Sequence, residues 1–160
     1  MNQENEEINE NEENPQETNE SGESTILETH LLINKYLCGE LTKLEKGYAE
    51  VTLTTEDEMI VDEMGLIHGG FVFGAADFAA MAAVNEKNVV LVASNCQFLA
   101  PAKKGDIVLV KAKVRQKEGR KRNVSVQAYV KNIKIFDGEF MTVITEKHVL
   151  KLKLYDEDKM

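Results

Sequence analysis

The chain has no tryptophan, and aromatic residues make up only 6% of its 160 residues, so a core must be mainly aliphatic. No apolar run approaches 18 residues, and no membrane-spanning helix is expected. The N-terminus lacks the basic and apolar regions of a secretory signal. The only cysteines, Cys38 and Cys96, are isolated in apolar sequence. These absences predict a cytoplasmic protein with reduced, buried thiols and no disulfide.

Lysine and arginine are missing from residues 1–24, which hold nine glutamates among Asn and Gln. Such a segment cannot bury enough apolar surface to offset its ordering entropy. We therefore predict a disordered acidic tail over 1–24, as a solvating leader or a binding tail, and one folded domain over 25–160. The other 19 acidic residues balance 19 basic ones, so the domain is near neutral. A near-neutral surface does not favour nucleic-acid binding.

Residues 67–84 (IHGGFVFGAADFAAMAAV) are apolar almost all round, and this composition predicts a helix buried on every side. Before it, we predict a helix capped by Ser24 that runs to about Leu37 and stops at Gly39, and a strand over 47–55. After it, we predict strands over 88–100, 107–116, 123–135 and 140–154, with hairpin turns at Glu118-Gly119 and Asp137-Gly138. The expected fold is α+β, with one antiparallel sheet covering one face of the central helix. A two-fold dimer is the commonest way to cover the other face.

Two segments carry a family resemblance. His68 to Ala80 (HGGFVFGAADFAA) resembles the HGG helix of hotdog-fold acyl-CoA thioesterases, and Phe98 to Asp106 (FLAPAKKGD) resembles the strand and turn that follow it. The resemblance implies a hotdog fold, in which a five- to six-stranded antiparallel sheet wraps a long helix. A closer likeness is to the effector domain of FapR, the malonyl-CoA-responsive repressors of bacterial lipid synthesis. FapR carries a helix-turn-helix before this domain, and here an acidic segment stands in that place, so DNA binding is not carried over.

Gly69 and Gly70 stand at the start of the long predicted helix. First-turn amides have no intrahelical acceptor, and the helix dipole adds positive charge, so a thioester carbonyl would be polarised there. The resemblance gives this oxyanion-type role to the Gly70 amide. The alternative is that the glycine pair only permits a tight turn. His68 is expected to cap the helix or fix the loop before it.

Asp77 follows Gly70 by about two helical turns, so both share a face with Gly74 and Met81. By resemblance, Asp77 is the nucleophile or general base of a thioesterase. The alternative is a structural carboxyl that holds a dimer seam through hydrogen bonds. Asp62 stands where many thioesterases of this type have Asn, and its charge is expected to disfavour an oxyanion nearby.

Further ligand contacts are predicted from side-chain chemistry. The aromatic candidates for an acyl tunnel, with ordinary core as the alternative, are Phe71, Phe73, Phe78 and Phe98. The basic candidates for coenzyme A phosphates, with solvated turns as the alternative, are Lys103, Lys104, Arg120, Lys121 and Arg122.

The sequence thus favours an acyl-CoA-binding homodimer or tetramer, acting as a non-catalytic sensor or regulatory binder in lipid metabolism. The alternative is an acyl-CoA thioesterase that uses Asp77. A dehydratase is disfavoured, because its catalytic His pattern before the helix is replaced by HGG. A purely structural dimer is the remaining possibility. No cofactor or metal is expected besides acyl-CoA as ligand or substrate.

Overall fold

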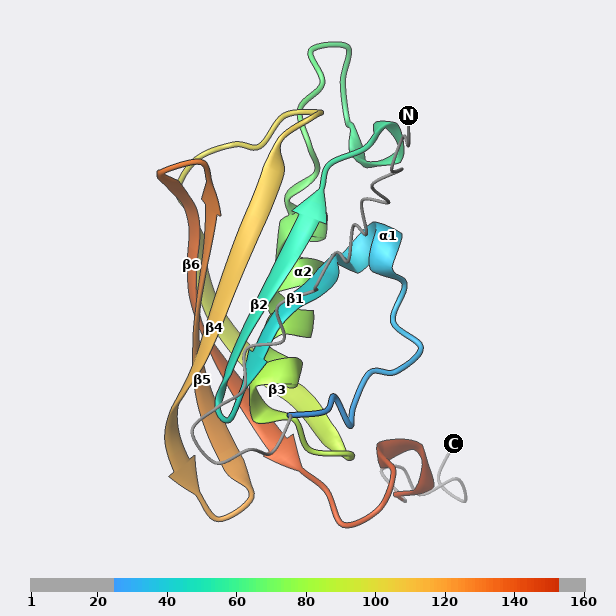
Figure 1. Ribbon diagram of the computed structural model, residues 1–160, viewed down its shortest axis with the longest axis vertical. Helices are drawn as coiled ribbons and strands as arrows, with labels where there is room; N and C mark the ends of the chain where they lie inside the picture. The colour runs from blue at the N-terminus through green and yellow to red at the C-terminus, as the bar shows by residue number, and fades with distance from the viewer. Residues whose placement is uncertain (1–24, 153–160) are drawn as a thin grey trace, which may run out of the picture.

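A computed structural model describes residues 25–152, so the acidic tail predicted over 1–24 lies outside the described residues. An antiparallel six-stranded sheet curls around one long helix (Figure 1). The elements in chain order are α1 (Lys35–Cys38), β1 (Glu40–Glu45), β2 (Tyr48–Thr54), the 3₁₀ turn η1 (Asp57–Met59), α2 (Gly69–Val84), β3 (Val89–Phe98), β4 (Ile107–Glu118), β5 (Lys121–Val130), β6 (Ile133–Ile144) and the 3₁₀ turn η2 (Val149–Lys151). The sheet order is β1-β2-β4-β5-β6-β3. This arrangement confirms the predicted α+β fold.

Helix α2 and the inner face of the sheet form the core. Alanines and larger apolar residues of α2 are buried, including Phe78 and Met81. Alternate side chains of the central strands point at the helix, and Val108, Val110 and Val126 are fully buried. Their period of two matches the pleat of a strand with one covered face. The prediction of a long buried helix is confirmed.

The helix predicted over about 25–37 is wrong except for the single turn of α1. Residues 25–34 form an irregular strap along α2, in which His30 adopts a left-handed φ of 54°. Asn85, the left-handed C-cap of α2, holds the strap: its Oδ1 accepts the Glu28 N–H at 2.8 Å, and its Nδ2 donates to the Ile26 carbonyl at 2.8 Å. The apolar spacing did not mark a buried face, because Leu32 is 99% exposed. Gly39 ends α1 as predicted, at φ 90°.

Strand β1 was not predicted. A register shift between Leu41 and Lys43 in its pairing with β2 breaks the alternation of its side chains. Leu41 and Leu44, three residues apart, both pack against the core as a result. A period-two pattern cannot identify such a bulged strand.

The hairpin turn predicted at Asp137-Gly138 is wrong, because both residues lie inside β6. Gly138 pairs with Val126 of β5 and with Cys96 of β3. The turn that joins β5 to β6 instead lies at residues 131–132, where Lys131 has a left-handed φ of 54°. The predicted turn at Glu118-Gly119 is confirmed.

The strand predicted over 140–154 ends earlier, at Ile144. After it the chain leaves the sheet and forms η2, which His148 caps by accepting the Leu150 N–H through Nδ1 at 3.2 Å. The alternation of Leu and Lys after residue 149 therefore reflects no sheet pairing in the described part.

Cys38 and Cys96 are both free, and each is half-buried rather than buried. Within residues 25–152, no helix is both long and apolar enough to cross a membrane.

Gly138 is expected to resist even a methyl group. A Cβ there would lie 2.9 Å from the Cys96 Cβ and 3.0 Å from the Phe140 ring, closer than real side chains approach. Gly138→Ala should lower the free energy of unfolding by about 1–3 kcal/mol, measured by urea denaturation, because the overpacked residue cannot move within a paired strand. Asp137→Ala, one residue earlier on the outer face, is the matched control. Equal stability of Gly138→Ala and the parent protein would contradict this packing.

Candidate ligand-binding site

The N-terminal end of α2 opens into an apolar pocket. The His68 carbonyl accepts the Phe71 N–H at 3.1 Å, whereas the amides of Gly69 and Gly70 have no acceptor within residues 25–152. Beside Gly69 lies a cavity of about 360 Å³ lined by Gly69, Val72, Phe98 and Ile135, among others, which we call the helix-start pocket. The two predicted amides are thus available to a ligand oxygen. The dipole of a sixteen-residue helix supplies positive charge at the same point.

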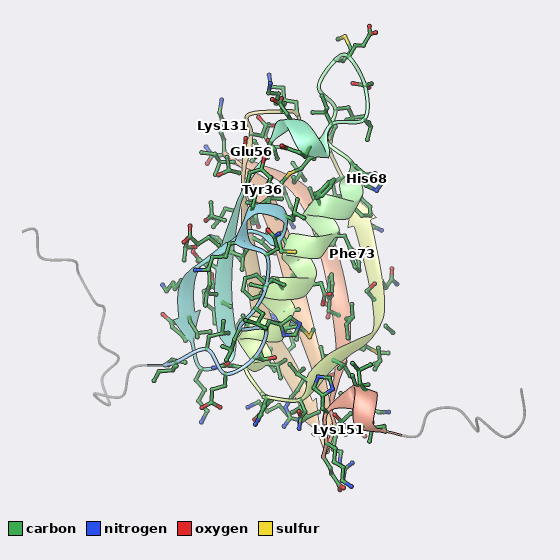
Figure 2. The ribbon with its side chains drawn as sticks, turned by 90° about the vertical axis from the view of Figure 1, so that its right-hand side faces the viewer. Tyr36, Glu56, His68, Phe73, Lys131 and Lys151 are labelled. Carbon is green, nitrogen blue, oxygen red and sulfur yellow. The ribbon has the colours of Figure 1, made fainter. Side chains whose placement is uncertain are left out.

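His68 occupies the N-cap position of α2, as predicted, but its side chain makes no capping hydrogen bond. Its backbone N–H donates to the Met59 carbonyl at 2.9 Å, which fixes the loop before the helix. The exposed imidazole lies over Gly70, with Nε2 2.8 Å from where a Cβ would stand. Figure 2 shows the ring at the start of the helix. A side chain at position 70 would displace this ring, so the position of His68 also requires glycine there.

Asp77 projects from the middle of α2. The side chain is half-buried, and its Oδ1 is buried without a hydrogen-bond partner among the described residues. Burial raises the pKa of the Asp77 carboxyl above its ordinary value of 3.8. Seven residues of helix rise about 10.5 Å, so Gly70 and Asp77 share a face without meeting. Within one subunit, a single carbonyl cannot contact both groups.

A second cavity, of about 490 Å³, lies beside Asp77, and we call it the Asp77 pocket. It is lined by the strap, by α2, by the start of β3 and by the turn before η2, through residues that include His30, Met81, Leu91 and His148. His30 is held by Thr29, whose Oγ1 lies 2.8 Å from Nδ1, and burial lowers the pKa of the imidazole. Neither histidine was predicted here, because only the fold brings both ends of the domain to α2.

Between these two pockets, α2 leaves one stripe uncovered. We define the α2 stripe as Gly70, Gly74 and Asp77, which follow one another at helical spacing. A Cβ built on Gly74 would meet no atom within 4 Å. The small residues of the stripe therefore leave room for another surface to approach the helix backbone.

Of the four phenylalanines proposed for an acyl tunnel, two pack in the core and two lie near the start of α2. Phe73 packs on Phe140, with ring centroids 5.4 Å apart, and Phe78 is buried. Phe71 is half-buried and lies edge-on to His68. Phe98 is 56% exposed and covers Gly69 in the helix-start pocket, which makes it the one best placed to touch a ligand.

The predicted basic residues lie at opposite ends of the subunit. Lys103 lines a pocket near the start of α2, and Lys104 beside it pairs with Asp57. Arg120 pairs with Glu146, and Arg122 lines a cavity with Val84 and Asn85 at the other end of α2. The Arg122 Nη1 donates to the carbonyls of Gly119 and Lys121 at 2.7 and 2.8 Å. Within one subunit, the structure does not bring the arginines to Gly70.

Asp62 has a local task in the loop before α2. Its Oδ1 accepts the N–H groups of Met64 and Leu66 at 2.9 and 3.1 Å. An Ile60–Ile67 bridge closes this loop, which projects beyond the α2 start (Figure 1). The carboxylate organises the loop, and the expectation that its charge disfavours a nearby oxyanion stays a prediction.

Comparison with known proteins identifies the family. The sequence profile of the thioesterase superfamily matches residues 64–135, which include the start of α2, Asp77 and β3. A solved, uncharacterised protein of Pyrococcus horikoshii is 46% identical with a TM-score of 0.78, and the match covers 79% of this chain and 97% of that one. This chain belongs to the thioesterase superfamily. Its six-stranded sheet around one helix is the predicted hotdog fold.

Among curated relatives, the FapR transcription factor of Thermoanaerobacter is 30% identical over 115 residues, covering 71% of this chain and 57% of FapR. A protein of Aquifex aeolicus named methylthioribose-1-phosphate isomerase is 49% identical over 117 residues, which are 73% of this chain but 26% of that protein. The chain thus spans about a quarter to just over half of these relatives.

Two solved neighbours were determined with coenzyme A compounds. A hypothetical thioesterase of Streptococcus pneumoniae with coenzyme A is 19% identical with a TM-score of 0.62, and the match covers 68% of this chain and 87% of that one. A Streptococcus mutans protein bound to acetyl-CoA is 20% identical with a TM-score of 0.66, covering 78% and 99%. At this identity they establish the fold alone. Among residues 25–152, no group of His, Cys, Asp and Glu is arranged to hold a metal ion.

The raised pKa of Asp77 predicts a pH-dependent gain for Asp77→Asn. In the unfolded chain the carboxyl ionises near 3.8, whereas in the folded protein it ionises at higher pH. Stability of the parent therefore falls as pH rises through that window, and Asn does not titrate. As pH rises from about 4 through that window, Asp77→Asn should become steadily more stable relative to the parent in urea denaturation. The opposite trend would place a hydrogen-bond donor against Asp77 from outside the subunit.

Proposed function

We propose that this chain binds an acyl-CoA thioester as a non-catalytic binder or sensor linked to lipid metabolism. The observation that carries the proposal is the pair of unpaired amides, Gly69 and Gly70, at the start of α2, where Gly69 lines the apolar helix-start pocket. The amides suit a carbonyl oxygen, and the apolar walls suit the carbon chain beside it. The coenzyme A compounds in two structural neighbours support this ligand class. Coenzyme A and free thiols both suit the cytoplasm.

The proposal includes a homodimer formed through β3 and the α2 stripe. Strand β3 is ten residues long and ends the sheet, so one of its edges has no partner strand among residues 25–152. Val92 to Asn95, in its middle, are exposed. Such an edge pairs readily with another strand. A two-fold axis at this edge would extend the sheet and set two α2 helices antiparallel on the same face.

The same two-fold axis would join two half-sites. Gly70 and Asp77 lie about 10.5 Å apart along one helix. In antiparallel helices that meet near Gly74, the Gly70 amide of one copy faces the Asp77 carboxyl of the other. A thioester carbonyl could then lie between an amide and a carboxyl, with the helix-start pocket of one copy next to the Asp77 pocket of its mate.

The leading alternative is a thioesterase that uses Asp77. Its support is the buried Oδ1, which has no partner among the described residues, and the raised pKa of that carboxyl, because a higher pKa makes the carboxylate a stronger base. As base, Asp77 would take a proton from water, whose oxygen attacks the carbonyl while the coenzyme A thiol departs. The binder is favoured because the FapR relatives, which match 71% of this chain in Thermoanaerobacter, are named transcription factors rather than enzymes.

One set of samples distinguishes the binder from the thioesterase. With a panel of acyl-CoAs, we expect at least one compound to stabilise the protein without releasing thiol. A ligand at 100 times its dissociation constant adds about 2.7 kcal/mol, which thermal unfolding can detect. Samples of protein alone subtract the signal of the free thiols Cys38 and Cys96.

Thiol release that continues over many turnovers, and that Asp77→Ala abolishes with the fold intact, would replace the binder by the thioesterase. If no thioester either stabilises the protein or is hydrolysed, the acyl-CoA proposal is wrong.

The dimer predicts a specific effect of Gly74→Leu. The side chain has room within the subunit, so the fold should persist, but it would hold the second α2 away. We expect light scattering to shift from dimer to monomer at micromolar concentration and acyl-CoA binding to be lost with it. Gln127→Leu, on the outer face of the sheet, should stay dimeric. An unchanged dimer of Gly74→Leu would exclude the α2 stripe from the interface.

A further inference from the structure

The second half of β4 and the start of β5 form a hairpin with a dense positive charge. Seven of the twelve residues from 111 to 122 are Lys or Arg, and Glu118 is the only acidic residue among them. We call residues 111–122 the basic hairpin, whose turn lies at Glu118-Gly119. Its basic side chains are exposed, except that Arg122 is half-buried. The acyl-CoA site proposed above uses none of them.

The described residues neutralise little of this charge. Arg120 pairs with Glu146. Arg122 donates to backbone carbonyls, and Lys111 lies over the Tyr129 ring, 5.7 Å from its centroid, but neither contact supplies a negative charge. The basic-hairpin residues that have no ion pair among residues 25–152 include Lys113, Arg115, Lys117 and Lys121. Like charges so close together repel, so an acidic partner would stabilise this surface.

The end of the basic hairpin is open to such a partner. Strand β2 pairs with β4 only as far as Lys113, so residues 115–118 have no partner strand on the β2 side among residues 25–152. The β1–β2 turn lies against this edge, because the Gly47 carbonyl accepts the Val114 N–H at 2.9 Å, and the turn brings Lys46 there. Figure 1 shows the β1–β2 and β4–β5 turns at the same end of the molecule. A free strand edge beside several cations suits an extended acidic chain.

The acidic residues 1–24 are attached beside this edge. Thr25, where the described chain begins, lines a cavity of about 290 Å³ whose basic lining residues are Lys46, Lys117 and Arg122. Two residues of chain span at most about 7 Å, so covalent connection alone holds Glu23 near these three cations. The same cavity is lined by the acidic residues Glu45, which pairs with Lys43, and Glu86.

The charge of residues 1–24 complements that of the basic hairpin. The segment holds nine Glu and no Lys or Arg. One exposed ion pair contributes little, but several on an attached segment act together at an effective concentration of about millimolar. Lys131 lies at the opposite end of the molecule, where His68 starts α2 (Figure 2). Because the sixteen residues of α2 span about 24 Å, the glutamates nearest Thr25 reach the basic hairpin first.

From these observations we propose that residues 1–24 bind the basic hairpin of their own chain through their glutamates. The contact neutralises the hairpin and keeps it from binding other polyanions, such as nucleic acids. The segment is then a built-in competitor for the most basic surface of the domain. This inference stands independently of acyl-CoA binding, since the surface lies outside the proposed acyl-CoA site.

Amide NMR spectra of the full chain test the contact from the side of the hairpin. Replacing all nine Glu of residues 1–24 by Gln should shift the amide signals of residues 46–47 and 113–122, and leave those of Lys103 and Lys131 in place. Raising the salt to about 1 M, where charges are screened beyond about 3 Å, should move the parent signals to the positions of this tail variant. Shifts at Lys103 and Lys131 instead, or at neither surface, would overturn the proposal.

The reverse substitution tests the contact from the side of residues 1–24. The double variant Lys117→Gln/Lys121→Gln should shift the amide signals of Glu20 and Glu23. The matched control Lys35→Gln/Lys131→Gln removes the same charge from other exposed lysines and should leave both signals in place. Equal shifts in the two double variants would show only a general effect of net charge, and the proposal would be wrong.

Two further measurements distinguish the other partners. Single-stranded DNA should shift the hairpin signals of the tail variant but not those of the parent. Equal shifts in both proteins would make nucleic acid the partner of the hairpin and overturn the proposal. Carbodiimide crosslinking in a mixture of ¹⁵N-labelled and unlabelled protein should join glutamates of residues 1–24 to hairpin lysines of the same isotope. Crosslinks that combine both isotopes would assign the contact to a second copy instead of the same chain.

Discussion

Burial of α2 is the constraint on which the rest of the structure depends. A sixteen-residue helix with Asp77 as its only charged residue must be covered on nearly every side, and a curved sheet of six strands covers most of it. Gly138 lets the rings of Phe136 and Phe140 close over the inner face of β6. Asn85 then ties the strap across the far end of the helix. What the sheet and strap leave open is the α2 stripe, and the proposed function concentrates there.

The start and the middle of α2 offer different chemistry. The start offers unpaired amides beside an apolar pocket, and the middle offers the Asp77 carboxyl, whose pKa burial raises. Because about 10.5 Å of helix separates the two groups, neither makes a complete site alone. A second copy related by a two-fold axis at β3 would bring the Gly70 amide of one subunit to the Asp77 carboxyl of the other. The same surface would then serve both dimerisation and ligand binding. The likeness to FapR and to proteins with bound coenzyme A fits this arrangement.

The basic residues show how structure sorts a cluster that sequence cannot. Lys104 and Arg120 are paired with acidic side chains, and Arg122 donates to backbone carbonyls. Lys103 instead lines a cavity together with Lys131, a residue from a turn nearly thirty positions later that the sheet brings to the same place. Asp62 shows a local task that sequence did not reveal, since its carboxylate accepts two N–H groups of its own loop.

The sequence by itself determined the elements whose pattern reflects burial on a regular face, which are α2, β2 and β4. It also determined the turn at Gly119 and the glycine pair before the half-buried Asp77. Its resemblance to a known helix also determined the family. Tertiary structure decided what local pattern cannot encode. Asp137-Gly138 has the sequence of a hairpin turn, but here the glycine lies within β6 and makes room for the rings of Phe136 and Phe140. In β1, the bulge breaks the alternation of apolar and polar residues by which a strand is recognised. Asn85 draws residues 26–28 away from the helix that their spacing predicts, because two hydrogen bonds from a distant side chain outweigh a weak local preference. The Asp77 pocket and the helix-start pocket also depend on the fold, since their walls come from segments that only the packing around α2 brings together.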